Sequence, residues 1–372
     1  MEFKIDRKSL LRGLTRTHGV ADRKSSMPIL SNVLMHAHDG SLHLSTTDLY
    51  LGVRTTAPVD ISDEGMVAVS ARTLFNIVKN LPDGPVHLKS DANHAVEIRC
   101  GKVNYRIPGM PGEDFPPLAN PGEADFITLE AGLIGQLIGR TQYSMSNDDA
   151  RPHLAGSLFE RTGERLRTVT TDGHRLSKAE AILAGESEGV DFSILIPHKG
   201  ISELRRIIDD AKSGESSTIE FATAASNAFF KREGIMLVVK LADERFPPYD
   251  KVIPQKQSRK IVAERAMLAE ALRRISLVAN DKSGAVRLKL VEGQLDICSE
   301  NPDVGEGSEE VSVDYAGEPL EIGFNAKYVL DVLNALNTDE VVLELSGELD
   351  PGVIRTPDEH GEFVGVIMPM RI

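Results

Sequence analysis

The sequence predicts an α+β fold made of three similar copies of one plan, each with two helices packed on antiparallel sheets. A helix-like run of apolar residues recurs three times along the 372 residues, and a glycine-containing hairpin pattern follows each run. The spacing of landmark residues also repeats, because Pro28 and Pro152 are 124 residues apart, and so are Asp48 and Asp172. Matched spacing of this kind is typical of internal repeats.

Each copy begins with a short strand that leads into a helix. The strands are predicted at residues 3–5, 126–129 and 260–263, and the accompanying helix windows span residues 6–24, 131–151 and 259–282. In each window apolar residues recur at helical spacing. These residues are Leu10, Leu11 and Leu14; Leu133, Ile134, Leu137 and Ile138; and Met267, Leu268, Ala271, Leu272 and Ile275.

A hairpin and a second helix complete each copy. Alternating apolar strands flank turns at Asp39-Gly40, Gly163 and Gly293, which is a hairpin signature. The second helices are predicted in windows 70–81, 196–212 and 324–337. Further strands follow, and the first two copies end in the related segments EDFPPL and ERFPPY, whereas the third ends in GVIMPMRI.

Polar, proline-containing segments at residues 120–125 and 254–260 are predicted to link the copies. At roughly 100–200 residues per domain, the length predicts two or three domains. We therefore expect domains at residues 1–121, 122–255 and 256–372.

Composition narrows the class of protein. No apolar run approaches the roughly 20 residues of a membrane span, and the N-terminus lacks the apolar region of a signal peptide. Cys100 and Cys298 are far apart and lack metal-ligand spacing, so neither a disulfide framework nor a zinc module is expected. We expect a cytoplasmic protein without membrane contact, metal or cofactor.

Charge is distributed unevenly along the chain. The formal net charge is −14, yet the six helix windows together carry +10 and the remaining residues carry −24. If the helices share one face of a continuous sheet, that face is basic and attracts phosphates irrespective of base sequence. The alternative is that these charges are simply solvated, as charge runs usually are.

The sequence resembles the β subunit of bacterial DNA polymerase III, the sliding clamp, from Met1 to Ile372. Five stretches carry the resemblance in order and at family spacing over the whole chain. They are PILSN at 28–32, TDGHRLS at 171–177, ERFPPY at 244–249, FNAKYVLDVLNAL at 324–336 and the terminal MPMRI.

The resemblance implies a head-to-tail homodimer of three-domain chains that closes into a ring around duplex DNA, with helices lining the hole. It implies a dimer interface in which Tyr105 and Ile107 of one copy meet Leu277 and Val278 of the next. Packing of these four residues within their own core is the alternative. The implied DNA-facing residues are Lys24, Arg72, Lys79, Arg151, Lys199 and Arg205.

The resemblance also implies a cleft between the second and third domains that binds short linear motifs. Its partners would be the replicative polymerase, the ATP-dependent clamp loader, and other polymerases and repair proteins. Without the family, the segment at 171–176 reads as a turn between ordinary strands, and MPMRI as an edge strand. The matching positions are Leu154, Thr171, Gly173, His174, Arg175, Leu176, Pro247, Val252, Asn325, Tyr328, Leu349, Val366, Met368, Pro369, Met370 and Arg371.

Four positions depart from the family pattern. Pro152 and His153 stand where the best-known member has two tyrosines, Lys24 replaces an arginine, and Ser283 replaces an aromatic residue. These departures bear on affinity and partner preference.

Two other functions were weighed. A hydrolase using Asp172 and His174 lacks support, because the sequence contains no P-loop, zinc-protease or nucleophile-elbow motif. A sequence-specific regulator lacks a helix-turn-helix or zinc-finger pattern. A clamp paralogue with a specialised role would keep the ring and the cleft, so the sequence leaves it open.

Overall fold

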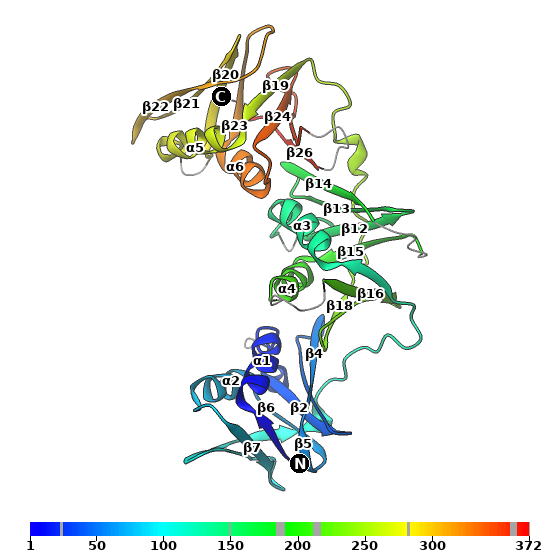
Figure 1. Ribbon diagram of the computed structural model, residues 1–372. Coiled ribbons are helices and arrows are strands. Elements are labelled where there is room, and N and C mark those ends of the chain that lie inside the picture. Colours follow the sequence, from blue (N-terminus) through cyan, green and yellow to red (C-terminus); the bar gives the residue numbers. More distant parts are fainter. Residues whose placement is uncertain are drawn as a thin grey trace. The chain divides into compact units, whose positions relative to one another are not determined.

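Figure 1 shows the computed structural model of the chain, which describes residues 1–22, 25–148, 150–183, 190–210, 217–280, 283–357 and 363–371. The chain divides into two compact units, each considered separately. Unit 1 comprises Met1–Gly132 and Ser202–Leu241, and unit 2 comprises Leu133–Ile201 and Ala242–Ile372. This division falls within helices α3 (Ala131–Thr141) and α4 (His198–Asp209). The domain boundaries expected after residues 121 and 255 remain a prediction.

Unit 1 contains two antiparallel sheets and the helices α1 (Arg7–Thr17) and α2 (Ala71–Asn80). In the five-stranded sheet the order is β5 (Asp60–Asp63), β1 (Glu2–Asp6), β7 (Pro85–Ser90), β8 (Val96–Cys100) and β9 (Val103–Ile107). In the nine-stranded sheet it is β10 (Gly109–Pro111), β6 (Gly65–Ser70), β2 (Asn32–His38), β3 (Ser41–Thr47), β4 (Leu51–Pro58), β18 (Ile235–Lys240), β17 (Asn227–Arg232), β16 (Thr218–Ala224) and β11 (Ile127–Glu130).

A single apolar core joins these parts of unit 1. Leu10 and Leu14 of α1, and Leu74 and Val78 of α2, are fully buried together with Phe3 of β1. The helical spacing of these residues places them on one face, which explains why the local sequence forms amphipathic helices.

Unit 2 repeats the arrangement with an eight-stranded and a four-stranded antiparallel sheet. The first has the order β15 (Phe192–Pro197), β12 (Gly156–Thr162), β13 (Arg165–Thr171), β14 (Arg175–Ile182), β26 (Phe363–Ile367), β25 (Gly352–Arg355), β24 (Glu340–Leu345) and β19 (Arg259–Glu264). The second has the order β22 (Gly305–Ser312), β21 (Gln294–Asn301), β20 (Ala285–Val291) and β23 (Leu320–Asn325). Helices α5 (Arg265–Ile275) and α6 (Ala326–Ala335) pack against each other and against these sheets.

The six predicted helices are confirmed, and each is shorter than its window. Side-chain caps define several starts: Asp6 accepts from the backbone N–H groups of Lys8 and Ser9, and Ser70 and Asn325 cap α2 and α6. Single 3-10 turns continue α3 at Gln142–Ser144 and α5 at Ser276–Val278, which accounts for part of the extra length predicted there. No helix in the described ranges is long and apolar enough to cross a membrane.

The predicted repeat is visible at the level of individual hydrogen bonds. In the turn after β3, Asp48 Oδ1 accepts from the N–H groups of Tyr50 and Leu51, at 3.0 and 2.7 Å. In the turn after β13, Asp172 Oδ1 accepts from His174 and Arg175, at 2.9 and 3.0 Å. The two Thr-Thr-Asp triplets therefore build the same turn, in which the aspartate side chain accepts from the backbone N–H groups two and three residues later.

Candidate functional site

The turn between β13 and β14 presents the first group of predicted site residues. Gly173 has φ of 90°, a left-handed conformation that glycine adopts without strain, and both Gly173 and His174 are exposed. Thr171 is buried, and its Oγ1 donates to the carbonyl oxygen of Arg175 at 2.7 Å. The buried side chain of Thr171 therefore stabilises the turn, while Gly173 and His174 are exposed to solvent.

Asp172 and His174 do not form a catalytic pair. The second carboxylate oxygen of Asp172 accepts from Nε of Arg175 at 3.0 Å, so both oxygens hold the turn. No hydrogen bond joins the His174 ring to Asp172 within the described ranges.

Buried apolar side chains lie beneath this turn. Strand β14 pairs with β26 so that Leu176 lies opposite Val366, and both belong to a buried cluster with Val169 and Tyr249. Leu154, in the 3-10 helix Pro152–Leu154, is also buried. Leu154, Leu176 and Val366, which are among the predicted cleft residues, are therefore buried within this chain.

Other predicted apolar residues reach the surface. Val252 is 46% exposed, Met368 is 40% exposed and Leu349 is 64% exposed, while Pro247 is half-buried. The N–H of Met368 donates to the carbonyl oxygen of His174 at 2.9 Å, which fixes the residue after β26 beside the turn. The predicted cleft residues thus include both buried and exposed apolar side chains, and the cleft itself remains a prediction.

Arg175 lies at the centre of a buried polar network. It is 7% exposed; its Nη1 donates to Asp331 of α6 at 2.6 Å and its Nη2 donates to the carbonyl oxygen of Tyr143 at 2.5 Å. Its guanidinium also lies over the ring of Tyr328, 4.4 Å from the centroid. The side chain links β14 to α6, and the predicted place of Arg175 in the motif-binding cleft remains a prediction.

Residues of β23 and of the segment after β26 line a pocket, and Asn325 ends β23 at the start of α6. Asn325 caps α6 and also donates from Nδ2 to the carbonyl oxygen of Ser283 at 3.0 Å, so Ser283 contributes a backbone contact. The N–H of Met370 donates to the carbonyl oxygen of Gly323 at 2.8 Å. Beside this contact is a pocket of about 380 Å³, whose lining includes Leu349, Met370 and Arg371. Pro369, which precedes Met370, is half-buried.

A tyrosine-centred network supports the same region and was not predicted. The Tyr249 hydroxyl donates to Glu160 at 3.0 Å and accepts from Arg167 at 3.2 Å. Burial is the main reason that the pKa of Tyr249 rises to about 12, so the hydroxyl keeps its proton. Its partners are 82 and 89 residues away, and no local motif signals such a contact.

The predicted DNA-facing residues fall into two groups. Arg72 and Lys79 are exposed on α2, and Lys199 is exposed on α4. Arg151 and Arg205 are held by acidic neighbours, Asp148 and Asp209, both at 2.8 Å. Lys24 lies outside the described residues.

Arg151 also contributes to the hairpin turn, since its Nη1 donates to the carbonyl oxygen of Asp172 at 2.9 Å. Elsewhere on the helices, Arg7 pairs with Asp83 and Arg16 with Asp210, at 2.7 and 2.8 Å. The helical positive charge is therefore partly balanced by acidic neighbours.

The predicted dimer residues differ in exposure. Leu277 is 77% exposed in the 3-10 helix Ser276–Val278, and Tyr105 is exposed on β9, an edge strand of its sheet. Ile107, by contrast, belongs to the core of unit 1. Within this chain, the core-packing alternative therefore applies to Ile107, while Val278 is half-buried.

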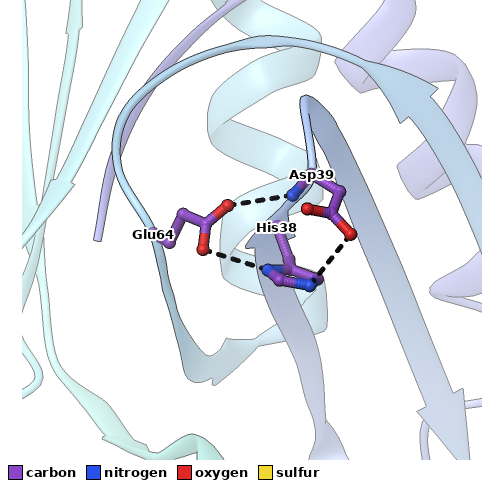
Figure 2. A group of neighbouring side chains, drawn as sticks. All are labelled: His38, Asp39 and Glu64. Carbon is purple, nitrogen blue, oxygen red and sulfur yellow. Dashed lines mark hydrogen bonds and ion pairs between the residues drawn. The ribbon is translucent and has the colours of Figure 1, made fainter.

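Three side chains of metal-ligand types meet beside the β2–β3 hairpin and were not predicted: His38 and Asp39 belong to the hairpin, and Glu64 lies between β5 and β6 (Figure 2). His38 Nδ1 lies 3.0 Å from Glu64 Oε2, and its Nε2 lies 3.1 Å from Asp39 Oδ2. The hydrogen bond to Glu64, followed by the charge of Asp39, raises the pKa of His38. All three residues are exposed, and their contacts are those of an imidazolium between two carboxylates.

Family models match almost the whole chain. The models for the N-terminal, central and C-terminal domains of the DNA polymerase III beta subunit match residues 1–119, 128–248 and 250–371. The beta sliding clamp of Escherichia coli K12 is 35% identical, with 100% of both chains covered.

Solved structures agree over the same length. The Caulobacter crescentus beta sliding clamp, with polyethylene glycol at a region proposed for beta-motif tethering, is 31% identical with a TM-score of 0.94. The sliding clamp of Bartonella birtlesii bound to griselimycin is 34% identical with a TM-score of 0.92. Both comparisons cover 100% of each chain. The three-domain arrangement predicted from the repeat is therefore confirmed.

Proposed function

Because the chain belongs to the DNA polymerase III beta subunit family, and is thus a sliding clamp, we propose that two copies close head to tail into a ring around duplex DNA. A sliding clamp is a processivity factor and has no catalytic site of its own. The ring would tether the replicative polymerase by raising its effective concentration at the primer end. We place this activity in the cytoplasm.

Edge strands at two separate places support a head-to-tail contact. Strand β9 ends the five-stranded sheet and β22 ends the four-stranded sheet. Exposed edges invite pairing with another chain, and a heterologous contact between two different edges closes into a ring when the rotation allows. Tyr105 on β9 and Leu277 beside β22 would supply apolar area to that contact.

The charge of the helices supports DNA binding without base readout. Exposed Arg72, Lys79 and Lys199 lie on α2 and α4. Twelve helices from two copies, at about 10 Å each, would line the hole, with a diameter of about 38 Å measured between opposite helix axes. Such a hole leaves room for water around a duplex, so contacts would be with phosphates and would permit sliding.

The observation that carries the docking proposal is the pairing of β14 with β26, which brings the turn at 171–174 beside Met368. Met368 and Val252 are exposed, Met368 follows buried Val366 by two residues, and Met side chains adapt to different anchors. We propose that short motifs with Leu or Phe anchors bind here. The region proposed for beta-motif tethering in the Caulobacter crescentus clamp supports this reading.

Fluorescence anisotropy with a labelled peptide of the Gln-Leu-x-Leu-Phe type tests the docking site. We expect binding near micromolar, about −8 kcal/mol, and loss of it when residues 368–372 are removed or in Met368→Asp. Ile182→Asp is the matched control, because Ile182 is another exposed apolar residue of unit 2. No binding by the intact dimer would reject this site and favour a clamp paralogue with other partners.

Sedimentation and DNA retention test the ring separately. We expect the intact protein to sediment as a dimer and, once loaded, to stay on nicked circular DNA but leave linear DNA. Leu277→Asp should give monomers that still bind the peptide. A sequence-specific regulator would instead hold linear fragments tightly, and that result would contradict the ring.

A further inference from the structure

The outer hollow, as we name it, is a cavity of about 560 Å³ in unit 1. Its lining includes His43 of β3 and Arg54 and Thr56 of β4 on one side, and Thr128, Thr218 and Lys231 on the other. Its volume is within the range of small-molecule sites.

The outer hollow opens on the sheet face that α1 does not cover. Leu44 and Thr55 face α1, since a Cβ placed on Gly13 of that helix would lie 2.8 Å from Leu44 and 3.3 Å from Thr55. Successive side chains of a strand point to opposite faces, so His43 and Arg54 point away from α1. The outer hollow therefore lies on the sheet face opposite to helix α1.

Arg54 lies on this face without an acidic partner in the described part of the chain. Its side-chain hydrogen bond is a weak one, from Nε to Ser45 Oγ at 3.4 Å. Other strand arginines of unit 1 are paired: Arg99 with Glu97 at 2.6 Å, and Arg106 with Asp91 at 2.5 Å. Burial lowers the pKa of Arg54, which reflects the cost of a partly desolvated cation.

We propose that the outer hollow binds a compact oxyanion, a phosphate or a carboxylate group, through the guanidinium of Arg54. An arginine fork offers two parallel donors that match the oxygens of either group, and an anion would compensate its charge. His43, whose Nδ1 lies 3.0 Å from Thr56 Oγ1, places a further polar pair beside it.

The other charges of the lining limit the size of the ligand. The strand register places Arg54, Lys231 and Glu220 on the face of the outer hollow, whereas the buried side chain of Arg232 points to the opposite face, where its Nη1 donates to the carbonyl oxygen of Ile208 at 3.0 Å. Lys231 lies opposite Glu220 in the strand register, and its Nζ sits 3.5 Å from the centroid of the Phe126 ring. Because the carboxylate of Glu220 repels extended polyanions, the site suits one anionic group rather than a nucleic-acid backbone.

Isothermal titration of the full-length protein with inorganic phosphate and with acetate, at constant ionic strength set by chloride, tests the proposal. We expect saturable binding of at least one of the two anions. The anion that binds more tightly identifies the ligand class, phosphate or carboxylate. Arg54→Gln should weaken the binding by about tenfold or more. Arg54→Lys keeps the charge but loses the fork, so its affinity for the anion should lie between that of the unmodified protein and that of Arg54→Gln.

Arg99→Gln is the matched control, because Arg99 is an exposed strand arginine of unit 1 outside the outer hollow. It should bind like the unmodified protein. No saturable binding of either anion, or equal binding by the unmodified protein and both Arg54 variants, would overturn the proposal. Arg54→Lys serves as the decisive variant if Arg54→Gln does not fold.

Discussion

Leu49 occupies the turn position that Gly173 occupies in the equivalent hairpin of the second copy. Its φ is 76° and that of Gly173 is 90°, so a branched side chain adopts a conformation that suits glycine. Left-handed backbone costs a non-glycine residue roughly 1–2 kcal/mol. Leu49 is 51% exposed, so little packing offsets that cost.

We therefore expect Leu49→Gly to raise the free energy of unfolding by about 1 kcal/mol. Gly173→Ala should lower the free energy of unfolding by a similar amount, because it places a Cβ on a left-handed backbone. Urea unfolding of the two variants and the unmodified protein measures both changes. A loss of stability in Leu49→Gly would show that Leu49 makes packing contacts that outweigh the strain.

Glu180 makes the stability of unit 2 depend on pH. Burial alone would raise the pKa of Glu180, but hydrogen bonds from Arg165 and Arg167 lower it below 4.5 overall. A carboxyl whose pKa is lower in the folded state stabilises the protein above its unfolded pKa. That contribution is lost as pH falls from about 4.5 through the lower folded pKa.

The measurement is urea unfolding between pH 7 and pH 3, comparing the protein with Glu180→Gln. The variant should be less stable at pH 7, and the difference should shrink below the unfolded pKa of the carboxyl. A difference independent of pH would mean that Glu180 acts through packing.

Residues of the candidate site were predictable in position but not always in role. The turn at Gly173 followed from its sequence, because Asp-Gly is a strong local signal for a turn. The burial of Arg175 did not, because its partners Asp331 and Tyr143 are 156 and 32 residues away. Contacts at such separations depend on the tertiary fold.

At the scale of elements, Arg175 makes helix α6 and strand β14 depend on each other. Asp331 Oδ2 accepts from Arg175 at 2.6 Å and from Lys327 at 2.8 Å, so one carboxylate binds a buried and an exposed cation. Arg175→Met should lower the free energy of unfolding by about 3 kcal/mol, because it leaves buried acceptors without their donor. Lys327→Met should lower it by less than about 1 kcal/mol, because ion pairs exposed to solvent contribute little to stability.

Thermal unfolding of both variants measures the comparison, with peptide binding as a second readout. Equal effects of the two substitutions would contradict the assignment of Arg175 as the buried link.

Helices and hairpins were the most predictable elements, because their periodicity and turns are local. The Asp39-Gly40 turn has positive φ at both residues, 49° and 68°, as a tight hairpin requires. The pairing of β4 with β18 and of β14 with β26 was not predictable. Those strands join different copies, and strand alternation specifies which face is buried but not which edge will be the neighbour.

For the whole molecule, the charge pattern predicts a salt-dependent affinity for linear duplex DNA. Arg72 and Lys79 are exposed, so we assign each one phosphate contact. The double variant Arg72→Gln/Lys79→Gln should reduce the slope of log affinity against log salt by about 2. Anisotropy with a labelled linear duplex over a range of salt concentrations measures it.

Once the ring is loaded on a circle, retention should depend far less on salt, because it would be topological. Equal salt dependence on circles and on linear DNA would argue against enclosure.

The position of β26 within its sheet also has a consequence for synthesis. This strand lies between β14 and β25, although its residues follow both in the chain. Until residues 363–367 leave the ribosome, the sheet exists as two parts with unpaired inner edges, and such edges are prone to wrong partners. Nascent chains stalled before residue 363 should therefore bind chaperones more strongly than chains stalled well beyond 367.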